Sequence, residues 1–207
     1  MELTERDRDA LEVVCKFRFC LGRHIKALAG FSGQRSADRR LKALIEAGFL
    51  TRKKYIYGLP YLYTLTHKGR VLLGANKREG KIRVEQITHD IYVLDAVIYF
   101  MGKYQFTLRD IESAKELHIK DGFGARKHQP DFVLRGQGKT CAVEVELHPK
   151  TKSRLVKNIR DNYLNYDSQL WLTNDSKVWA LLESFRAEYP NIKVQRLQEV
   201  VKCPGAV

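Results

Sequence analysis

Leu44–Lys53 reads LIEAGFLTRK and Tyr63–Leu73 reads YTLTHKGRVLL, and the two stretches flank a turn at Gly58-Leu59-Pro60. The residues on both sides of this turn are rich in Tyr, Phe, Ile, Leu and Thr, a composition typical of β-strands. The segment therefore predicts a β-hairpin. Gly48 supplies the C-terminal stop of a preceding helix, and Thr66 caps a short following helix.

Three helices are predicted before the hairpin. Thr4 caps the first, a short amphipathic helix covers residues 21–28, and Ser32 or Ser36 caps a third that runs to Ala47. The third helix has an apolar face, formed by Ala37, Leu41, Leu44 and Ile45, and a separate cationic face, formed by Arg35, Arg39 and Lys42. Three helices, a hairpin and a closing helix over residues 4–73 resemble the winged helix-turn-helix family.

The resemblance implies a DNA-binding role for the third helix, which such proteins place in the major groove. The residues that it would present to DNA are Gln34, Arg35, Ser36, Arg39, Arg40 and Lys42. The hairpin would be the wing, with Arg52, Lys53 and Lys54 near the DNA backbone or minor groove. The alternating tyrosines of the hairpin, Tyr55, Tyr57, Tyr61 and Tyr63, predict one packed sheet face, with base stacking as the alternative.

Charge is concentrated in the first part of the chain. The 207 residues carry a net charge of +13 with a pI near 9.6. Residues 1–82 hold 18 Lys and Arg against 8 Asp and Glu, net +10, which leaves net +3 for residues 83–207. Such asymmetry indicates that the first part binds nucleic acid and that the second part has another role. The alternative is a protein-interaction module whose positive charge is incidental.

Composition places the chain among globular proteins, with 44% hydrophobic, 29% charged and 10% aromatic residues. The longest apolar stretch, Ile91–Met101, contains Asp95 and is too short to span a bilayer, so no membrane partner is expected. The N-terminus lacks a signal-peptide pattern, and a cytoplasmic location follows as the default. The four cysteines, at positions 15, 20, 141 and 203, form no CxxC pair, so we expect reduced thiols and no zinc.

A polar, glycine-containing segment divides the chain into two predicted domains. Gly74–Lys81 reads GANKREGK, which is typical of a surface linker. The prediction is an α/β (α+β) protein with a winged helix-turn-helix domain at 1–76, a linker at 77–83 and a second domain at 84–207. In the second domain we expect a buried helix over 84–101, a polar helix over 108–117, two strands over 129–134 and 140–147, and a helix over 151–165. A strand, a helix and a final strand follow.

Acidic residues gather on the two predicted strands. Glu144 and Glu146 share one face because side chains alternate along a strand. Asp131 starts the neighbouring strand and brings a third carboxylate close. Mg²⁺ and Mn²⁺ prefer such oxygen ligands, and metal-assisted phosphodiester hydrolysis is the chemistry that the pattern suits. The alternative is that the acids only form the solvated side of a half-buried sheet.

At these residues the sequence resembles the PD-(D/E)xK nuclease superfamily, through Pro130-Asp131 followed by Glu144-Val145-Glu146. The resemblance implies a restriction-endonuclease-like mixed sheet flanked by helices over roughly 84–200. It implies Asp131 and Glu144 as ligands of Mg²⁺ or Mn²⁺, with Glu146 beside them. The third motif position is usually Lys and is Glu146 here, so Lys152 or Lys157 of the next helix would have to supply the cation.

The order of motifs along the chain, including THDIYVLDAV and EVELHPKTKSRL, is similar to the replication-relaxation family of plasmids, phages and integrative elements. The resemblance implies a protein that binds double-stranded DNA and acts in replication, relaxation or mobilisation, as a metal-dependent endonuclease or as a non-catalytic regulator or accessory factor. A homodimer and a partner protein encoded by the same element are further expectations. No GxSxG motif or phosphate-binding glycine loop is present, so no nucleotide cofactor is expected.

Overall fold

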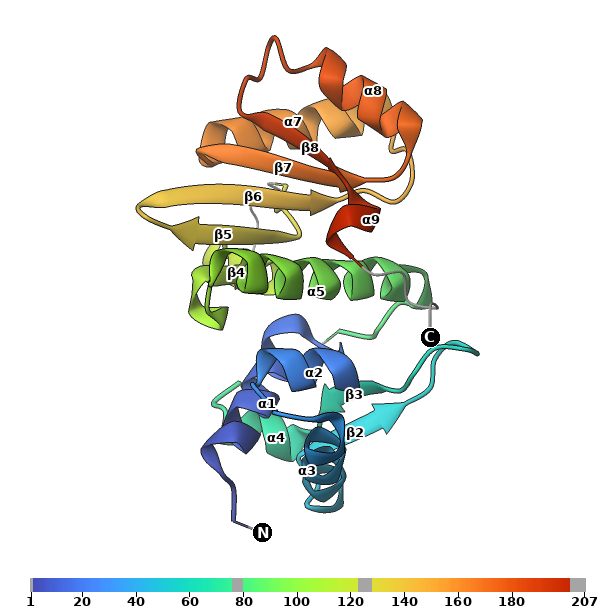
Figure 1. Cartoon of the computed structure of the whole chain (residues 1–207), viewed down its shortest axis with the longest axis vertical. Helices are drawn as coiled ribbons and strands as arrows, with labels where there is room; N and C mark the ends of the chain where they lie inside the picture. Colours follow the sequence, from blue (N-terminus) through green and yellow to red (C-terminus); the bar gives the residue numbers. More distant parts are fainter. Residues whose placement is uncertain (1, 76–79, 123–127, 202–207) are drawn as a thin grey trace. The chain divides into compact units, whose positions relative to one another are not determined.

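A computed structural model describes residues 2–75, 80–122 and 128–201 of the chain (Figure 1). It is a mixed α/β structure with two sheets, as predicted. The chain forms two compact units, Met1–Leu94 and Asp95–Val207. No helix within the described ranges is long and apolar enough to span a membrane. Cys203 and residues 77–79 of the predicted linker lie outside the described residues.

Unit 1 contains the predicted hairpin within a three-stranded antiparallel sheet of order β1-β3-β2. The strands of the hairpin, β2 and β3, are shorter than predicted because residues 54–61 form the connection between them. The elements of this unit, before the long helix α5, are α1 (Glu5–Phe17), β1 (Cys20–Leu21), α2 (Gly22–Leu28), α3 (Gln34–Glu46), β2 (Leu50–Lys53), β3 (Leu62–Leu65) and α4 (His67–Leu72).

Local sequence signals explain where α1 and α4 begin and where α3 ends. The predicted cap of α3 at Ser32 or Ser36 is wrong, because Gly33, which has no side chain to cap the helix, is its N-cap. The Thr4 hydroxyl accepts a hydrogen bond from the backbone N–H of Asp7, and the Asp7 carboxylate accepts one from the backbone N–H of Thr4, which closes a capping box on α1. Gly48 follows α3 with a φ of +76°, a left-handed conformation that glycine adopts without strain. Thr66 caps α4 by accepting from the N–H of Gly69 at 3.1 Å.

The core of unit 1 includes the beginning of α5 (Val84–Tyr104). Ile87 and Ile91 of α5 are buried in one cluster with Phe19, Leu21 and Leu62. The compact units therefore divide within α5, at residues 94 and 95, because these two isoleucines pack against the first sheet. The predicted domain boundary at 77–83 precedes this division and stays a prediction.

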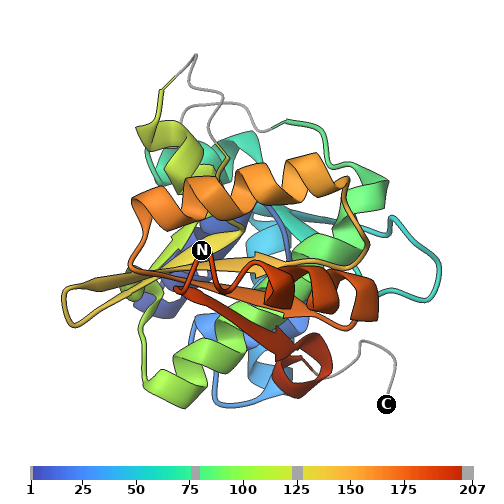
Figure 2. The ribbon, with the colours of Figure 1, turned by 90° about the horizontal axis from the view of Figure 1, so that it is seen from above.

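Unit 2 is built on a five-stranded mixed sheet of order β4-β5-β6-β7-β8, in which β5 is antiparallel to both neighbours and β6, β7 and β8 are parallel. Figure 2 shows α7 and α8 lying over the strands. The elements are η1 (Leu108–Asp110), β4 (Ile111–Ser113), α6 (Ala114–Lys120), β5 (Phe132–Gly136), β6 (Lys139–Val145), α7 (Lys152–Asn165), β7 (Ser168–Thr173), α8 (Ser176–Ser184), β8 (Ile192–Arg196) and α9 (Leu197–Val200).

Helices cover both faces of this sheet. Leu155 and Ile159 of α7 pack with Trp171 of β7 in one buried cluster. Phe132 lies on the opposite face of the sheet. Phe132 pairs with Val143 and Trp171 pairs with Glu144, and successive residues of a strand point to opposite faces. There the ring of Phe100, in the second half of α5, lies 6.4 Å from the ring of Phe132. The sheet is thus buried on both sides.

The predicted helix at 108–117 is wrong. Ile111–Ser113 forms the edge strand β4, paired with Phe132–Leu134 of β5, and only then does α6 begin. Ile111 is buried under this pairing, and Ser113 caps α6 by accepting from the N–H of Glu116 at 3.3 Å. The tertiary pairing of a three-residue strand overrides the helical pattern of its surroundings.

Candidate functional site

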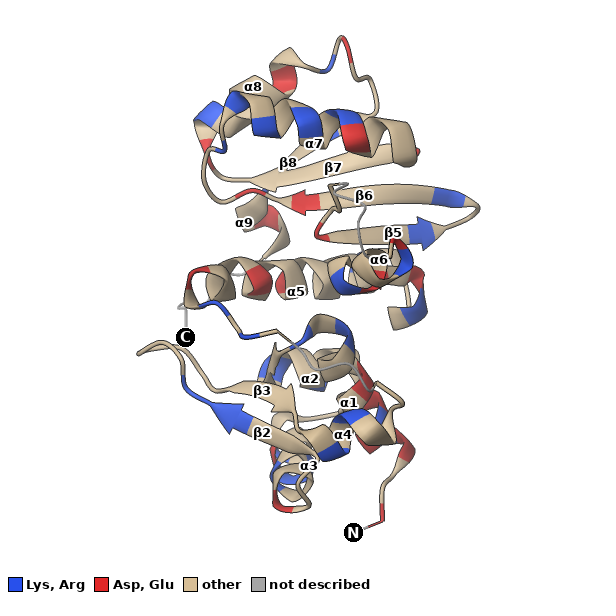
Figure 3. Cartoon of the chain, turned by 180° about the vertical axis from the view of Figure 1, so that it is seen from behind, with Lys and Arg blue, Asp and Glu red and all other residues tan. Residues whose placement is uncertain are grey.

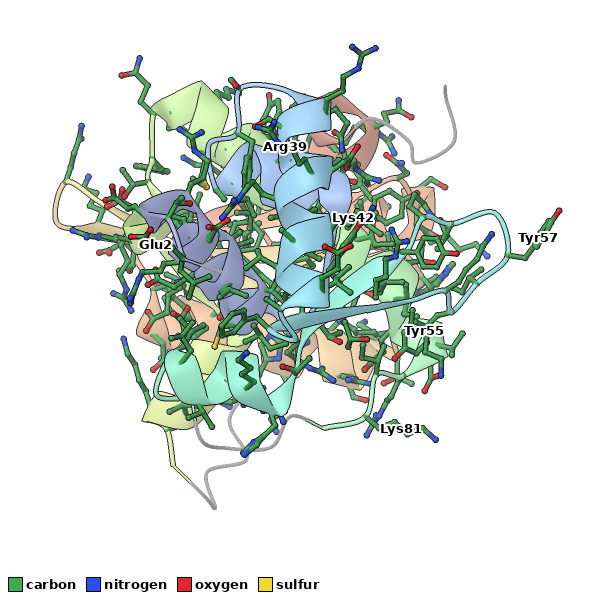
Figure 4. All side chains as sticks on the ribbon, turned by 90° about the horizontal axis from the view of Figure 1, so that it is seen from below. Glu2, Arg39, Lys42, Tyr55, Tyr57 and Lys81 are labelled. Atoms are coloured by element: carbon green, nitrogen blue, oxygen red, sulfur yellow. The ribbon has the colours of Figure 1, made fainter. Side chains whose placement is uncertain are left out.

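The outward face of α3 carries three exposed cations. Ala37, Leu41 and Leu44 are buried, whereas Arg35 and Arg39 are exposed, as is Lys42. Figure 4 shows α3 with Arg39 and Lys42 labelled, and Figure 3 shows basic residues on both α3 and β2. The predicted separation of an apolar face from a cationic face on this helix is confirmed.

Acidic residues of the same helix approach two of the predicted DNA-facing residues. The Gln34 side-chain amide donates to Asp38 at 2.8 Å, and the Lys42 ammonium lies 3.8 Å from Glu46. Both pairs are exposed, so Gln34 and the Lys42 ammonium stay accessible to solvent and to a polyanion. Ser36, on the same helix, is half-buried.

Arg40 has a structural contact that the sequence pattern did not indicate. Its Nε donates to the Asp7 carboxylate at 2.9 Å, and its Nη2 contacts the other carboxylate oxygen. Asp7 is fully buried. Burial by itself raises the pKa of Asp7, but hydrogen bonds from Arg40 and Thr4 outweigh it and hold the pKa below its ordinary value. Arg40 therefore joins α3 to α1, and its assignment to the DNA-facing set stays a prediction.

The β2–β3 hairpin presents cations together with aromatic rings. Arg52, Lys53 and Lys54 are all exposed. The tyrosines of the hairpin do not form one packed face: Tyr63 is buried in β3, whereas Tyr57, in the connection, is 97% exposed. The prediction of a single packed tyrosine face is wrong because residues 54–61 leave the strands and lose their alternation.

The three carboxylates of unit 2 come together on neighbouring strands. Asp131 directly precedes β5, and the register of β5 on β6 sets it opposite Glu144. Its carboxylate accepts a hydrogen bond from the N–H of Val145 at 2.7 Å. Glu144 and Glu146 are both buried. They do not form a solvated side of the sheet, and the alternative interpretation of these acids is therefore wrong.

The pKa of Glu146 reflects its burial and the charged groups close to it. Burial raises the pKa of its carboxyl, the Lys150 ammonium opposes this, and the nearby Glu144 and Asp131 carboxylates raise it further. The net pKa of Glu146 lies above the ordinary value. Lys150, 2.5 Å from the Glu146 carboxylate, is the basic residue that meets this acid.

Two side chains outside the predicted set hold Glu144. The Asn162 amide donates to Glu144 Oε1 at 2.8 Å, and Nε2 of His128 contacts the same oxygen. Asn162 could have been found by extending the buried stripe of α7 beyond Leu155 and Ile159. The segment from Glu146 to Lys150 is neither helix nor strand, so the Lys150 contact has no periodic sequence signal. The contact of His128 with Glu144 links residues 16 positions apart and has no local sequence signal.

The two predicted catalytic lysines lie elsewhere. Lys152 and Lys157 are exposed on α7, with Arg160 on the same side of the helix, and they line a shallow groove there. Asn158 and Asn162 occupy the buried side that faces the sheet. The helical rotation that buries these asparagines turns Lys157 away from the carboxylates.

The three carboxylates make contacts with protein groups in the structure. Residues 2–75, 80–122 and 128–201 contain no group of three or more His, Cys, Asp or Glu side chains that could hold a metal ion. Oxygens of Asp131 and Glu144 accept hydrogen bonds from Val145 and Asn162, and Glu146 is ion-paired. The predicted binding of Mg²⁺ or Mn²⁺ by these carboxylates stays a prediction.

Comparison with known proteins found no matching family model, no matching curated protein and no matching solved structure.

Proposed function

We propose that this chain is a DNA-binding protein of a mobile genetic element, and that unit 1 works as a winged helix-turn-helix. In this proposal α3 enters the major groove of double-stranded DNA, and the β2–β3 hairpin, which we call the wing, contacts the backbone or the minor groove. The observation that carries the proposal is the exposed cationic face of α3 opposite its buried apolar face.

Charge and burial support this assignment. Arg35, Arg39 and Lys42 are exposed on α3, as are the cations of the wing at positions 52–54. Such side chains neutralise phosphates and release counterions, which supplies most of the affinity of non-specific DNA binding. Arg40 is left out of this proposed interface, because its guanidinium already contacts the Asp7 carboxylate.

For unit 2 we propose a nuclease-like scaffold without cleavage activity, acting in replication, relaxation or mobilisation as an accessory or regulatory domain. The mixed sheet flanked by helices and the grouping of Asp131 with Glu144 support the nuclease-like architecture. The partners of the acids, Lys150 and Asn162, support the absence of cleavage, because they occupy the carboxylates with protein contacts. Docking of a second copy or of a partner protein is the role that we assign to this unit.

Titration of a labelled duplex at about 50 mM salt tests the DNA-binding proposal. We expect the double variant Arg39→Ala, Lys42→Ala to bind at least tenfold more weakly than wild type, because phosphate contacts contribute strongly at low salt. The matched control removes two exposed lysines of unit 2, Lys177→Ala and Lys193→Ala, and should bind as wild type does. Equal affinity of all three proteins would refute the assignment of α3.

A plasmid-nicking assay with Mg²⁺ or Mn²⁺ tests the second part of the proposal. We expect wild type and Asp131→Ala to leave supercoiled plasmid intact. Nicking by wild type that disappears in Asp131→Ala would instead establish a metal-dependent endonuclease at these carboxylates.

A further inference from the structure

We propose that the tip of the wing binds an unpaired base of DNA by stacking it on the ring of Tyr57. The inference rests on the proposed DNA-binding function and names the form of DNA that the wing recognises: a duplex with an unpaired or extruded base.

Tyr57 is exposed to a degree that packing does not explain. Its side chain is 97% exposed, the largest value for a large hydrophobic residue in the described part of the chain. The next residue, Gly58, has a φ of +82° and turns the backbone immediately after it. Figure 4 shows Tyr57 projecting from the connection between β2 and β3, clear of α3. The ring is therefore open to a ligand, with the Lys54 ammonium over one of its faces.

Cations accompany the rings along the wing. The Lys54 ammonium lies 5.4 Å from the centroid of Tyr57, and the Arg52 guanidinium lies 4.9 Å from that of Tyr61. No Asp or Glu occurs from position 47 to position 78. The wing thus offers an aromatic face within a segment whose only formal charges are positive, and this combination fits a polyanion that carries flat rings.

Nucleic acids combine negatively charged phosphates with flat bases. The exposed Tyr57 ring distinguishes an unpaired base from a paired one. In a regular duplex the bases stack on each other, so no base face is free for a tyrosine. An unpaired base has a free face, and stacking on an aromatic side chain increases affinity roughly 5- to 150-fold per base. A duplex with a short bulge provides phosphates for α3 and a free base for Tyr57 at once.

The test compares two DNA ligands with the full chain at about 50 mM salt. One is a fully paired duplex, and the other is the same duplex with a bulge of three adenines, one of them replaced by 2-aminopurine. We expect wild type to bind the bulged duplex at least fivefold more tightly and to quench the 2-aminopurine. Tyr57→Phe keeps the ring and should keep both effects.

Tyr57→Leu tests the aromatic face, because leucine keeps apolar bulk and has no ring, and Tyr57→Phe is its matched control. We expect it to lose the quenching and the preference, measured as the ratio of its affinities for the bulged and the paired duplex. A preference that survives in Tyr57→Leu, or wild type without a preference, overturns the stacking proposal and leaves duplex binding intact. Wild type that binds neither DNA overturns the proposed function and the stacking proposal together.

Discussion

Arg40 carries the same charge as Arg39 and lies on the same helix, α3, but it makes a different contact. Arg39 points to solvent, whereas the Arg40 guanidinium holds the buried carboxylate of Asp7, 33 positions earlier in the chain. The sequence predicts both residues on α3. It does not predict the partner, because a contact over this separation depends on how α1 packs on α3.

The first prediction concerns this pair and its dependence on pH. The pKa of Asp7 in the folded chain lies below the ordinary value of 3.8, so ionised Asp7 stabilises the fold above about pH 4. This contribution is lost as the pH falls through the folded pKa. We expect Arg40→Ala to lower the free energy of unfolding at pH 7 by about 1–3 kcal/mol, since it leaves a buried carboxylate without its main partner.

Urea denaturation at several pH values measures this effect. The difference between wild type and Arg40→Ala should shrink as the pH falls from about 4 through the lowered pKa of Asp7, below which Asp7 is protonated in folded wild type as well. Arg39→Ala is the control and should stay within about 0.5 kcal/mol of wild type, because the side chain is exposed. A difference that is as large at pH 3 as at pH 7 would contradict the role given to the Asp7 charge.

Among the acids of unit 2, the sequence predicts which strands bring them together but not what holds them. The period of two along β6 and the residue that follows it places Glu144 and Glu146 on one side, and the antiparallel register adds Asp131. His128 and Asn162 come from a loop and from α7, and their contacts with Glu144 depend on the packing of that helix against the sheet. Local patterns do not contain this information.

At the scale of elements, helices with caps and amphipathic faces were predictable, and short strands were not. Thr4 and Gly48 mark helix ends by interactions within a few residues, which a sequence displays directly. The strand β4 has only three residues and exists because β5 pairs with it. Its stabilisation is non-local, so the helical pattern around it led to the wrong prediction.

The second prediction concerns the glycine in α4. Alanine generally stabilises a helix interior relative to glycine by about 1 kcal/mol. A Cβ atom at Gly69, however, would lie 2.3 Å from the carbonyl oxygen of Phe49, a backbone atom that cannot move without disturbing the turn before β2. We expect Gly69→Ala to lower the free energy of unfolding by about 1–3 kcal/mol through overpacking.

Gly102 of α5 offers the matched comparison, because a Cβ atom there meets nothing within 4 Å. Gly102→Ala should therefore leave stability unchanged or raise it by up to about 1 kcal/mol. Thermal or urea unfolding of the two variants measures the contrast. Two variants that shift stability in the same direction and by the same amount would show that the close approach of α4 to Phe49 has no energetic role.

At the scale of the whole molecule, charge is divided unequally along the chain. The net charge of +13 is carried mainly by residues 1–82, which contribute +10. In the described part of unit 1, exposed cations occur on both elements of the proposed DNA interface, at positions 35, 39, 42, 52, 53 and 54 (Figure 3). If each meets one phosphate, counterion release determines how binding responds to salt.

The third prediction follows from this count. The slope of log K against log salt is about −0.9 per phosphate contact, so six contacts give a slope near −5 for wild type. Arg39→Ala, Lys42→Ala removes two contacts and should reduce the magnitude of the slope by about 2. The unit 2 control, Lys177→Ala, Lys193→Ala, should keep the slope of wild type. The slope of log K against log salt depends on the number of released counterions, whichever part of the chain displaces them. A slope that becomes shallower only in the unit 2 variant would therefore assign the phosphate contacts to the second unit.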